Sequence, residues 1–172
     1  SPNDSNKSLV SNFKSSLIIN FIKNPNGYPG EGRNIGAMNA NQDILLFLDS
    51  KTVPSKNYLQ KYYQLFCENQ YKVIFGRTFY HADSEKQKIV KAATFGSIGH
   101  ESTPGTMLLK KTFDQVGGFL QGIRRAEDLE WRESIKKSDF DYCVSNKVSC
   151  YYNQISKNFY EVLKKKFNLF HK

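Results

Sequence analysis

The chain has 172 residues, which is long enough for one domain with a single core and too short for two ordinary domains. Hydrophobic residues make up 39% of it and aromatic residues 14%, a composition that excludes a disordered chain. Lys and Arg number 25 against 16 Asp and Glu, and the net charge of +9 should attract anions: nucleotide diphosphates, acidic lipids or nucleic acid.

The first quarter of the chain predicts a strand, a phosphate-binding turn, a helix and a second strand. The apolar run 17–22 predicts a strand, and the Asn, Pro and Gly residues after it predict a loop. The glycine-rich run Gly30–Gly36 predicts a phosphate-binding turn into a helix at 33–41, because a helix start offers free N–H groups and the positive end of the helix dipole. The apolar run 43–48 then predicts a buried parallel strand, with Asp49 where its carboxyl end opens onto a ligand crevice.

The middle of the chain continues this alternation. Pro54 marks the start of a helix with an apolar stripe, and a strand follows at 71–75. A Lys-rich helix at about 84–95 leads into a loop of Gly, Ser, Thr and His residues at 96–103, which we expect to move over a substrate. The alternation of strand, helix and strand predicts an α/β sheet with right-handed crossovers.

The last third predicts shorter elements. We expect a strand at 105–110, a short helix at 111–116, a Gly-Gly turn, a helix opened by Glu127 and Asp128, and one or two strands within 139–152.

The C-terminal helix at about 154–171 is amphipathic. Its apolar face carries Ile155, Phe159, Val162, Leu163, Phe167 and Phe170, and its other face carries Lys157, Lys164 and Lys165. Two interpretations remain open: a terminal helix that packs on the domain with its basic face in water, or an interfacial helix that rests on an anionic membrane.

The sequence has no sign of membrane insertion or of cysteine-based sites. No run approaches the roughly 20 apolar residues of a membrane span and no signal peptide is visible, so we expect a cytoplasmic protein, with the inner face of the membrane as the alternative location. Cys67, Cys143 and Cys150 lack the spacing of a zinc site and are odd in number, which predicts free and mostly buried thiols.

Five motifs, in this order, resemble those of the family 2 glycosyltransferases. They are Arg33-Asn34-Ile35-Gly36, Phe47-Leu48-Asp49-Ser50, Pro104-Gly105-Thr106-Met107-Leu108-Leu109, Val116-Gly117-Gly118-Phe119 and Ala126-Glu127-Asp128-Leu129-Glu130. The resemblance implies one GT-A domain over residues 1–172, an α/β fold with a Rossmann-like mixed sheet flanked by helices. Such enzymes bind a nucleotide-activated sugar and pass the sugar to an acceptor hydroxyl.

Compared with that family, the chain lacks the first two strands of the domain. In a Rossmann-like order these strands lie between the run 17–22 and the run 43–48, so their loss leaves unpaired edges. We therefore expect an N-terminally truncated domain, which is either a fragment of a longer protein or a homo-oligomer that completes its sheet with another copy.

The resemblance implies a donor site made of Arg33, Asn34, Gly36, Asp49, Ser50 and Lys51. In the family the strand usually ends in Asp-x-Asp, whose carboxylates hold a divalent cation, Mg²⁺ or Mn²⁺, on the sugar diphosphate. Here Lys51 replaces the second carboxylate, and Asp49 beside an ammonium is a poor metal site. Lys51 either neutralises the leaving diphosphate itself or is a surface lysine of a site that has lost activity. For Arg33 the alternative is a helix-start arginine exposed to water.

The Glu127-Asp128 pair is the catalytic motif that the resemblance implies. Asp128 would act as general base on the acceptor hydroxyl, in a single displacement that inverts the anomeric carbon. Helix starts also favour carboxylates through the dipole alone, so capping is the alternative.

Three further residues are assigned to the acceptor or sugar. Trp131 would stack on a sugar ring, with a place in the core as its alternative. His100 would act from the candidate lid, with a solvated loop histidine as its alternative, and Gly105 belongs to the acceptor region through its motif.

The function that these residues imply is sugar transfer from a nucleotide-diphosphate donor to a saccharide or lipid-linked acceptor, in bacterial polysaccharide or glycolipid synthesis, with peripheral membrane contact as an option. The alternatives are a non-catalytic remnant that serves as a binding or assembly subunit, and a basic nucleic-acid-binding domain. No nucleic-acid-binding module is recognisable, so we expect no nucleic-acid partner, and an ordinary solvated surface explains the scattered lysines equally well.

Overall fold

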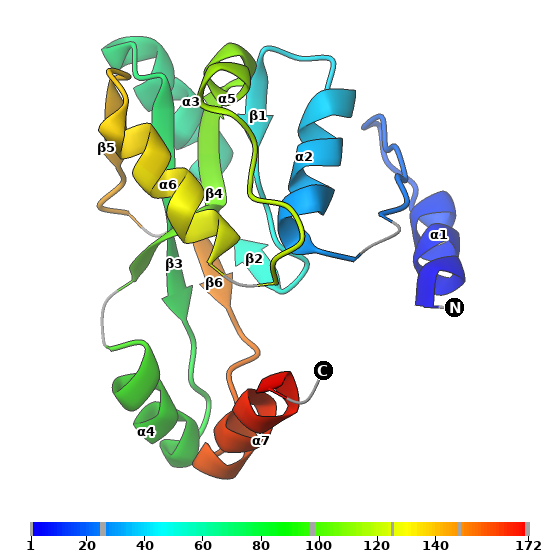
Figure 1. The fold of residues 1–172 in the computed structure, drawn as a ribbon, viewed down its shortest axis with the longest axis vertical. Coiled ribbons are helices and arrows are strands. Elements are labelled where there is room, and N and C mark those ends of the chain that lie inside the picture. The colour runs from blue at the N-terminus through cyan, green and yellow to red at the C-terminus, as the bar shows by residue number, and fades with distance from the viewer. Residues whose placement is uncertain (1, 25–26, 97–98, 125, 148, 171–172) are drawn as a thin grey trace.

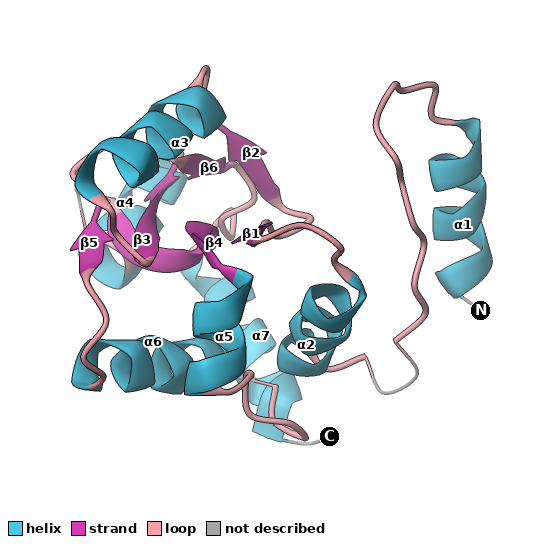
Figure 2. Cartoon of the chain, turned by 90° about the horizontal axis from the view of Figure 1, so that it is seen from above, coloured by secondary structure: helices cyan, strands magenta, loops and turns pink. Residues whose placement is uncertain are grey.

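The computed structural model describes residues 2–24, 27–96, 99–124, 126–147 and 149–170, with side chains described between residues 7 and 164. The described chain forms one mixed sheet with helices on both faces, and the N-terminal helix lies to one side of these layers (Figures 1 and 2). The helices are α1 (Pro2–Asn12), α2 (Pro29–Asn39), α3 (Tyr58–Asn69), α4 (Glu85–Thr94), α5 (Lys110–Val116), α6 (Glu127–Lys137) and α7 (Phe159–Phe170). The strands are β1 (Ile44–Leu46), β2 (Thr52–Pro54), β3 (Val73–Tyr80), β4 (His100–Leu109), β5 (Tyr142–Val144) and β6 (Cys150–Tyr152).

The sheet is built around β3. Its order is β1-β4-β3-β6-β2, and β5 also pairs with β3. The strand β3 is antiparallel to β4 and parallel to β5 and β6, while β1 and β2 are antiparallel to β4 and β6. The expected mixed α/β sheet flanked by helices is therefore confirmed.

Successive residues of β3 point to opposite faces of the sheet and feed two apolar clusters. Val73 and Phe75 pack with residues of α2, α5 and α6, among them Ala37, Phe113, Trp131 and Ile135. Ile74 packs on the other face against Tyr58, Tyr62 and Phe66 of α3. Figure 2 shows this arrangement, with α3 on one side of the strands and α2, α5 and α6 on the other. The helices that carry the candidate site therefore share one face of the sheet.

The glycine-rich run does not form a phosphate-binding turn. Residues 30–36 lie inside α2, which begins at Pro29, and the Gly32 N–H already donates to the Tyr28 carbonyl at 3.0 Å. Pro29 favours this early start because its fixed φ suits the first helical position. Gly30 is required for close packing, since a Cβ there would lie 2.7 Å from the Leu120 carbonyl oxygen. The prediction of a turn at this run is wrong.

The strand predicted at 17–22 is also wrong. The segment is irregular, and Leu17, Ile18 and Ile19 are exposed, with Ile18 at 94%. An apolar run becomes a strand only where a neighbouring strand takes up its N–H and C=O groups, and no strand of the described chain pairs with it.

Three other predictions of strands, helices and loops differ from the structure. The run 43–48 was expected in a parallel sheet, but β1 lies at the end of the strand order, where its neighbour is the antiparallel β4. Pro54 ends β2 rather than starting a helix, and α3 begins at Tyr58. Residues 100–103 of the expected mobile loop form the start of β4, while Ser97 and Ile98 lie outside the described residues.

The C-terminal helix is shorter than predicted. It begins at Phe159, and Ile155 is buried ahead of it. Phe159, Tyr160 and Leu163 are exposed, whereas the side chains of Lys165, Phe167 and Phe170 lie outside the described residues. Membrane contact by this helix stays a prediction. None of the helices in the described ranges has the length and apolar character of a membrane span.

Gly105 offers a test of how tightly β4 packs. Its φ is +83°, and a Cβ on it would lie 2.2 Å from the Ser149 Oγ. We expect Gly105→Ala to lower the free energy of unfolding by about 2 kcal/mol or more, because a left-handed backbone angle and a clash add together.

The matched control is Gly36→Ala in α2, where a Cβ would meet nothing within 4 Å. This control should raise the free energy of unfolding by about 0.5–1 kcal/mol through its higher helix propensity. Urea unfolding of both variants measures the difference. Equal effects of the two substitutions would contradict the described packing of Gly105.

Candidate active site

A cleft of about 1150 Å³ lies along β1, α2 and the start of α6. Most of the predicted site residues line it: Arg33, Gly36, Asp49, Ser50, Lys51, Glu127 and Asp128. The residues come from three separate parts of the sequence, which the sheet and the two helices bring together. The position of Asp49 at the cleft agrees with the prediction that the end of the 43–48 run opens onto a ligand crevice.

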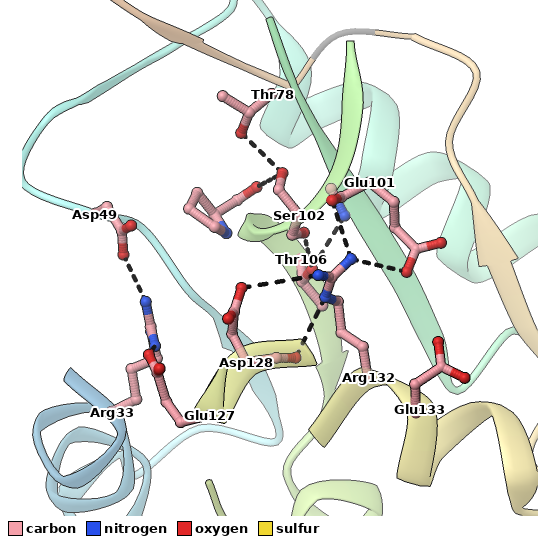
Figure 3. A network of polar contacts seen from close by, with 12 residues as sticks. Arg33, Asp49, Thr78, Glu101, Ser102, Thr106, Glu127, Asp128, Arg132 and Glu133 are labelled. Carbon is pink, nitrogen blue, oxygen red and sulfur yellow. Dashed lines mark hydrogen bonds and ion pairs between the residues drawn. The ribbon is translucent and has the colours of Figure 1, made fainter. Parts of the chain in front are cut away.

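Arg33 joins the two acidic motifs of the cleft. Its Nη2 donates to Asp49 Oδ1 at 3.0 Å, and its Nη1 donates to Glu127 Oε1 at 2.8 Å (Figure 3). The Arg33 side chain is 14% exposed and that of Glu127 is 6% exposed, so this part of the network is shielded from water. The guanidinium also lies 5.2 Å from the Phe119 ring centroid. The alternative of a water-exposed helix-start arginine is therefore wrong.

The electrostatics of Arg33 follow from this placement. Burial alone would lower the pKa of Arg33, but the charges and hydrogen bonds of Asp49 and Glu127 outweigh it and raise the pKa. The guanidinium is therefore a permanent cation, and it compensates the charge of the buried Glu127 carboxylate.

Asp49 is the more accessible of the two carboxylates, with 43% of its side chain exposed. Its backbone is fixed by Thr52, whose Oγ1 donates to the Asp49 carbonyl at 2.8 Å and whose N–H donates to it at 3.0 Å. Ser50 and Lys51 lie in this turn and are exposed at the cleft. The turn therefore presents one carboxylate and one ammonium side by side.

The described residues do not fit a metal site made by the protein alone. No group of three His, Cys, Asp or Glu side chains within the described ranges could hold an ion. Asp49 is already paired with Arg33, and Lys51 adds a second positive charge two residues later. Hard cations prefer several oxygen ligands, which this donor set does not offer.

Asp128 lies in the first turn of α6, beside the cleft. Its side chain is 31% exposed, and its Oδ2 is 3.8 Å from the Arg132 Nη2 (Figure 3). The N-cap of this helix is Ala126, with φ +65° and no side-chain capping hydrogen bond. Asp128 is therefore stabilised by the helix dipole and by Arg132 while part of its carboxylate faces the cleft.

Asn34 serves the fold rather than the cleft. Its Nδ2 donates to the Phe119 carbonyl and its Oδ1 accepts the Phe119 N–H, both at 2.8 Å. Gly118 must lack a side chain there, since a Cβ would lie 2.5 Å from Asn34 Oδ1. Both polar atoms of Asn34 are thus used inside the domain, and Asn34 is not among the residues that line the cleft.

The three predicted acceptor residues also lie away from the cleft lining. Trp131 is 1% exposed, packs against Phe119 and donates from Nε1 to the Gly117 carbonyl at 3.2 Å, so stacking on a sugar ring is wrong for this residue. Gly105 lies in β4, with its N–H donated to Phe47. His100 starts β4, where its Nε2 contacts the Phe95 carbonyl.

Sequence reasoning missed several residues of this region. Arg124 and Tyr152 line the cleft, but neither belongs to a motif, so nothing in the sequence indicated them. Arg132 and Glu101 form an ion pair at 3.0 Å beside Asp128. The spacing of four residues between Asp128 and Arg132 on one helix was the signal that could have identified the arginine.

The family model described as Glycosyl transferase family 2 matches residues 1–129 of the chain. No curated protein has significant sequence similarity to the chain.

Among solved structures, the chain is similar to that of Staphylococcus aureus TarS 1-349, with 18% identity and a TM-score of 0.55 over 83% of this chain and 45% of that one. The structure of TarS 1-349 in complex with UDP gives the same values, and the one in complex with UDP-GlcNAc gives 17% identity over 76% of this chain and 40% of that one. At this identity the likeness is one of fold. The chain spans less than half of the length of these structures.

The ion pairs of Arg33 generate a stability prediction. We expect Arg33→Met to lower the free energy of unfolding by about 3 kcal/mol, because it leaves Glu127 buried without a cation. The double variant Arg33→Met with Glu127→Gln should recover a large part of this loss. Urea unfolding measures both.

The control is Lys88→Met, which removes a cation from an exposed pair with Glu85 and should cost less than about 0.5 kcal/mol. A double variant no more stable than Arg33→Met would show that the buried charge is not the cause.

Proposed function

Because the chain belongs to glycosyl transferase family 2 and has the GT-A fold, we propose that it transfers a sugar from a nucleotide-diphosphate donor to an acceptor hydroxyl. One observation carries the proposal: Asp49 and Asp128, which are far apart in the sequence, line the same cleft together with Arg33 and Lys51. A carboxylate available as base and cations for a leaving group are the two requirements of this reaction.

The donor lies, in this proposal, along the turn at Asp49–Lys51. Lys51 and Arg124 are the cations of the cleft whose charge suits a diphosphate, since Arg33 is held by two carboxylates. The TarS structures with UDP and UDP-GlcNAc support a uridine nucleotide as the first donor to test. Protein cations take up the charge of the leaving group, and no step is assigned to a metal.

Asp128 acts as the general base. It accepts the proton of the acceptor hydroxyl while the oxygen bonds to the anomeric carbon and the bond from that carbon to the diphosphate oxygen breaks, releasing the nucleoside diphosphate. A single displacement of this kind inverts the anomeric configuration. The partial exposure of Asp128 in the cleft supports this role, because the base must reach the acceptor oxygen.

The acceptor in this proposal is a saccharide or a lipid-linked saccharide of bacterial polysaccharide or glycolipid synthesis. The net charge of +9 supports an acceptor or carrier that bears phosphate or carboxylate groups.

The second candidate is a non-catalytic binding domain that keeps the fold. It is favoured by the pairing of Asp49 with Arg33 and by Lys51 in place of a second carboxylate, which together make this turn a poor site for a metal that would bind the donor.

Asp128→Asn separates the two candidates. We expect wild type to turn over UDP-sugar with a suitable acceptor or with water, and Asp128→Asn to be at least about 100-fold slower. UDP should raise the melting temperature of both proteins, since Asp128 is not assigned to the nucleotide. The measurements are UDP release and thermal shift, each with EDTA and with Mn²⁺.

The control is Asp114→Asn, an exposed carboxylate on α5, which should leave both readouts unchanged. A thermal shift with UDP but no turnover by wild type would favour the binding domain. Turnover unaffected by Asp128→Asn would remove the proposed base.

We further propose that a second copy of the chain completes the sheet at β1. The Phe47 N–H donates to Thr106 and the Asp43 carbonyl accepts from Lys110, so the alternation directs the backbone groups of Ile44 and Leu46 to the open side of β1. The exposed apolar run 17–22 has the length and residue types of a strand, and an exchange of this run between two copies would cover both surfaces.

This proposal predicts a concentration-dependent dimer. We expect Ile18→Lys to weaken dimerisation about 10-fold or more without changing the melting temperature of the monomer, because Ile18 is 94% exposed. Ile89→Lys, at a 61% exposed position on α4, is the control and should dimerise like wild type. Sedimentation equilibrium measures both, and a wild type that stays monomeric up to its solubility limit contradicts the exchange.

A further inference from the structure

We infer that Arg132 is a positioning residue that holds the Asp128 carboxylate at the cleft, and that Glu101 of β4 limits how strongly Arg132 can pair with it. The inference rests on the proposed role of Asp128, but the arrangement of charges can be tested without turnover. It assigns a function to two residues that lie next to the cleft and are not among those that line it.

The Arg132 guanidinium is fixed by the backbone on two sides. Its Nε donates to the Asp128 carbonyl at 3.3 Å, and its Nη1 donates to the Glu101 carbonyl at 2.9 Å. The side chain is 12% exposed, so its rotation is restricted by packing as well. Figure 3 shows the guanidinium between α6 and β4, with one edge toward each carboxylate. Arg132 therefore has a defined place from which to act on Asp128.

The two carboxylates do not share Arg132 equally. Nη1 lies 3.0 Å from Glu101 Oε1, which is a direct hydrogen bond, whereas Nη2 lies 3.8 Å from Asp128 Oδ2, which is an ion-pair distance only. The more buried carboxylate, Glu101 at 20% exposure against 31% for Asp128, takes the shorter contact. Asp128 thus keeps its hydrogen-bonding capacity for another group.

Lys136 completes the chain of charges on the far side of Glu101. Its Nζ lies 2.9 Å from Glu101 Oε1 and 3.3 Å from Glu133 Oε1. Burial alone would lower the pKa of Lys136, but these two carboxylates outweigh it and raise the pKa. Glu101 is held from both sides by cations, and this fixes it as the partner of Arg132.

Other charged and titratable groups line the same cleft as Asp128. Arg124 comes from the loop before α6, Asp49 and Arg33 lie across the cleft, and Tyr152 of β6 lines it. Tyr80 of β3 also faces this group: burial raises the pKa of Tyr80, the charges of Tyr152, Asp128 and Asp49 add to the rise, and that of Arg132 opposes it. These groups are the same in every variant below, so differences between variants report on Arg132 and Glu101.

The weak pairing of Asp128 with an arginine that bonds mainly to Glu101 is suited to a general base. A carboxylate tightly bonded to a guanidinium is a weak base, because the cation stabilises its charged form, whereas a carboxylate without a neighbouring cation is not held in place. Removal of the Arg132 guanidinium should therefore release the Asp128 carboxylate. Removal of the Glu101 charge should strengthen the contact between Arg132 and Asp128, because Arg132 then has one carboxylate left to pair with.

The test is a double-mutant cycle between Arg132 and Asp128, measured by urea unfolding of the full chain at neutral pH. We expect the shifts of the urea midpoint caused by Arg132→Gln and Asp128→Asn to be non-additive in the double variant, and this coupling to grow when the same cycle is made in Glu101→Gln. The control cycle uses Lys137→Gln, which removes the same charge from an exposed position of α6, and its shifts should add to those of Asp128→Asn. A merely structural role of Arg132 would not make the coupling depend on Glu101.

A coupling of the same size in wild type and in Glu101→Gln would overturn the inference, and Arg132→Met replaces Arg132→Gln in the cycle if that variant fails to fold. If wild type shows turnover, Arg132→Gln should lower kcat by about 10-fold or more with little change of KM, and Arg132→Lys should restore part of it. Coupling that depends on Glu101 without turnover would keep the positioning role and reject the proposed function. Turnover without such coupling would do the reverse.

Discussion

The pairing of one buried arginine with two carboxylates holds the candidate site together. Arg33 on α2 bonds both to Asp49, at the end of the run that contains β1, and to Glu127, at the start of α6. Each partner belongs to a different element, so the guanidinium fixes three backbone segments relative to one another. A fork of donors on a planar group is suited to this, because it can bond two carboxylates at once in fixed directions. The cleft takes its shape from this junction.

The apolar core places that junction on one face of the sheet. Trp131 and Ile135 anchor α6 in the apolar cluster that contains Phe75 and Phe113, and this leaves its first turn, with Glu127 and Asp128, at the edge of the cleft. Phe119 packs on Trp131 and is held by both amide atoms of Asn34, so the loop before α6 is tied to α2 as well. The motifs had assigned Trp131 and Asn34 to substrate binding, but both residues instead support the residues that line the cleft.

The sequence predicted the strands and helices whose signals lie within the element itself. A strand within 43–48 and a helix that opens at Glu127 were placed correctly, because apolar runs and helix-start carboxylates have local causes, whereas the parallel pairing expected for 43–48 was wrong. The errors concern features that depend on distant partners. The run 17–22 lacked a neighbouring strand, and the glycines of 30–36 were tolerated within a helix started by Pro29. Trp131 and Asn34 were misjudged because their contacts come from residues that only the fold brings near.

The proposed nucleotide-sugar donor binds in the cleft between α2, the Asp49–Lys51 turn and the start of α6. The most direct measurement is an amide NMR titration of the chain with UDP, mapped residue by residue. We expect the largest shifts in residues 49–51, in Arg124 and in residues 126–128, with small shifts in α4, which lies away from α2 and the start of α6 at the lower end of Figure 1. Saturable shifts that avoid the cleft, or no shifts while UDP binds by another measure, would contradict this donor site.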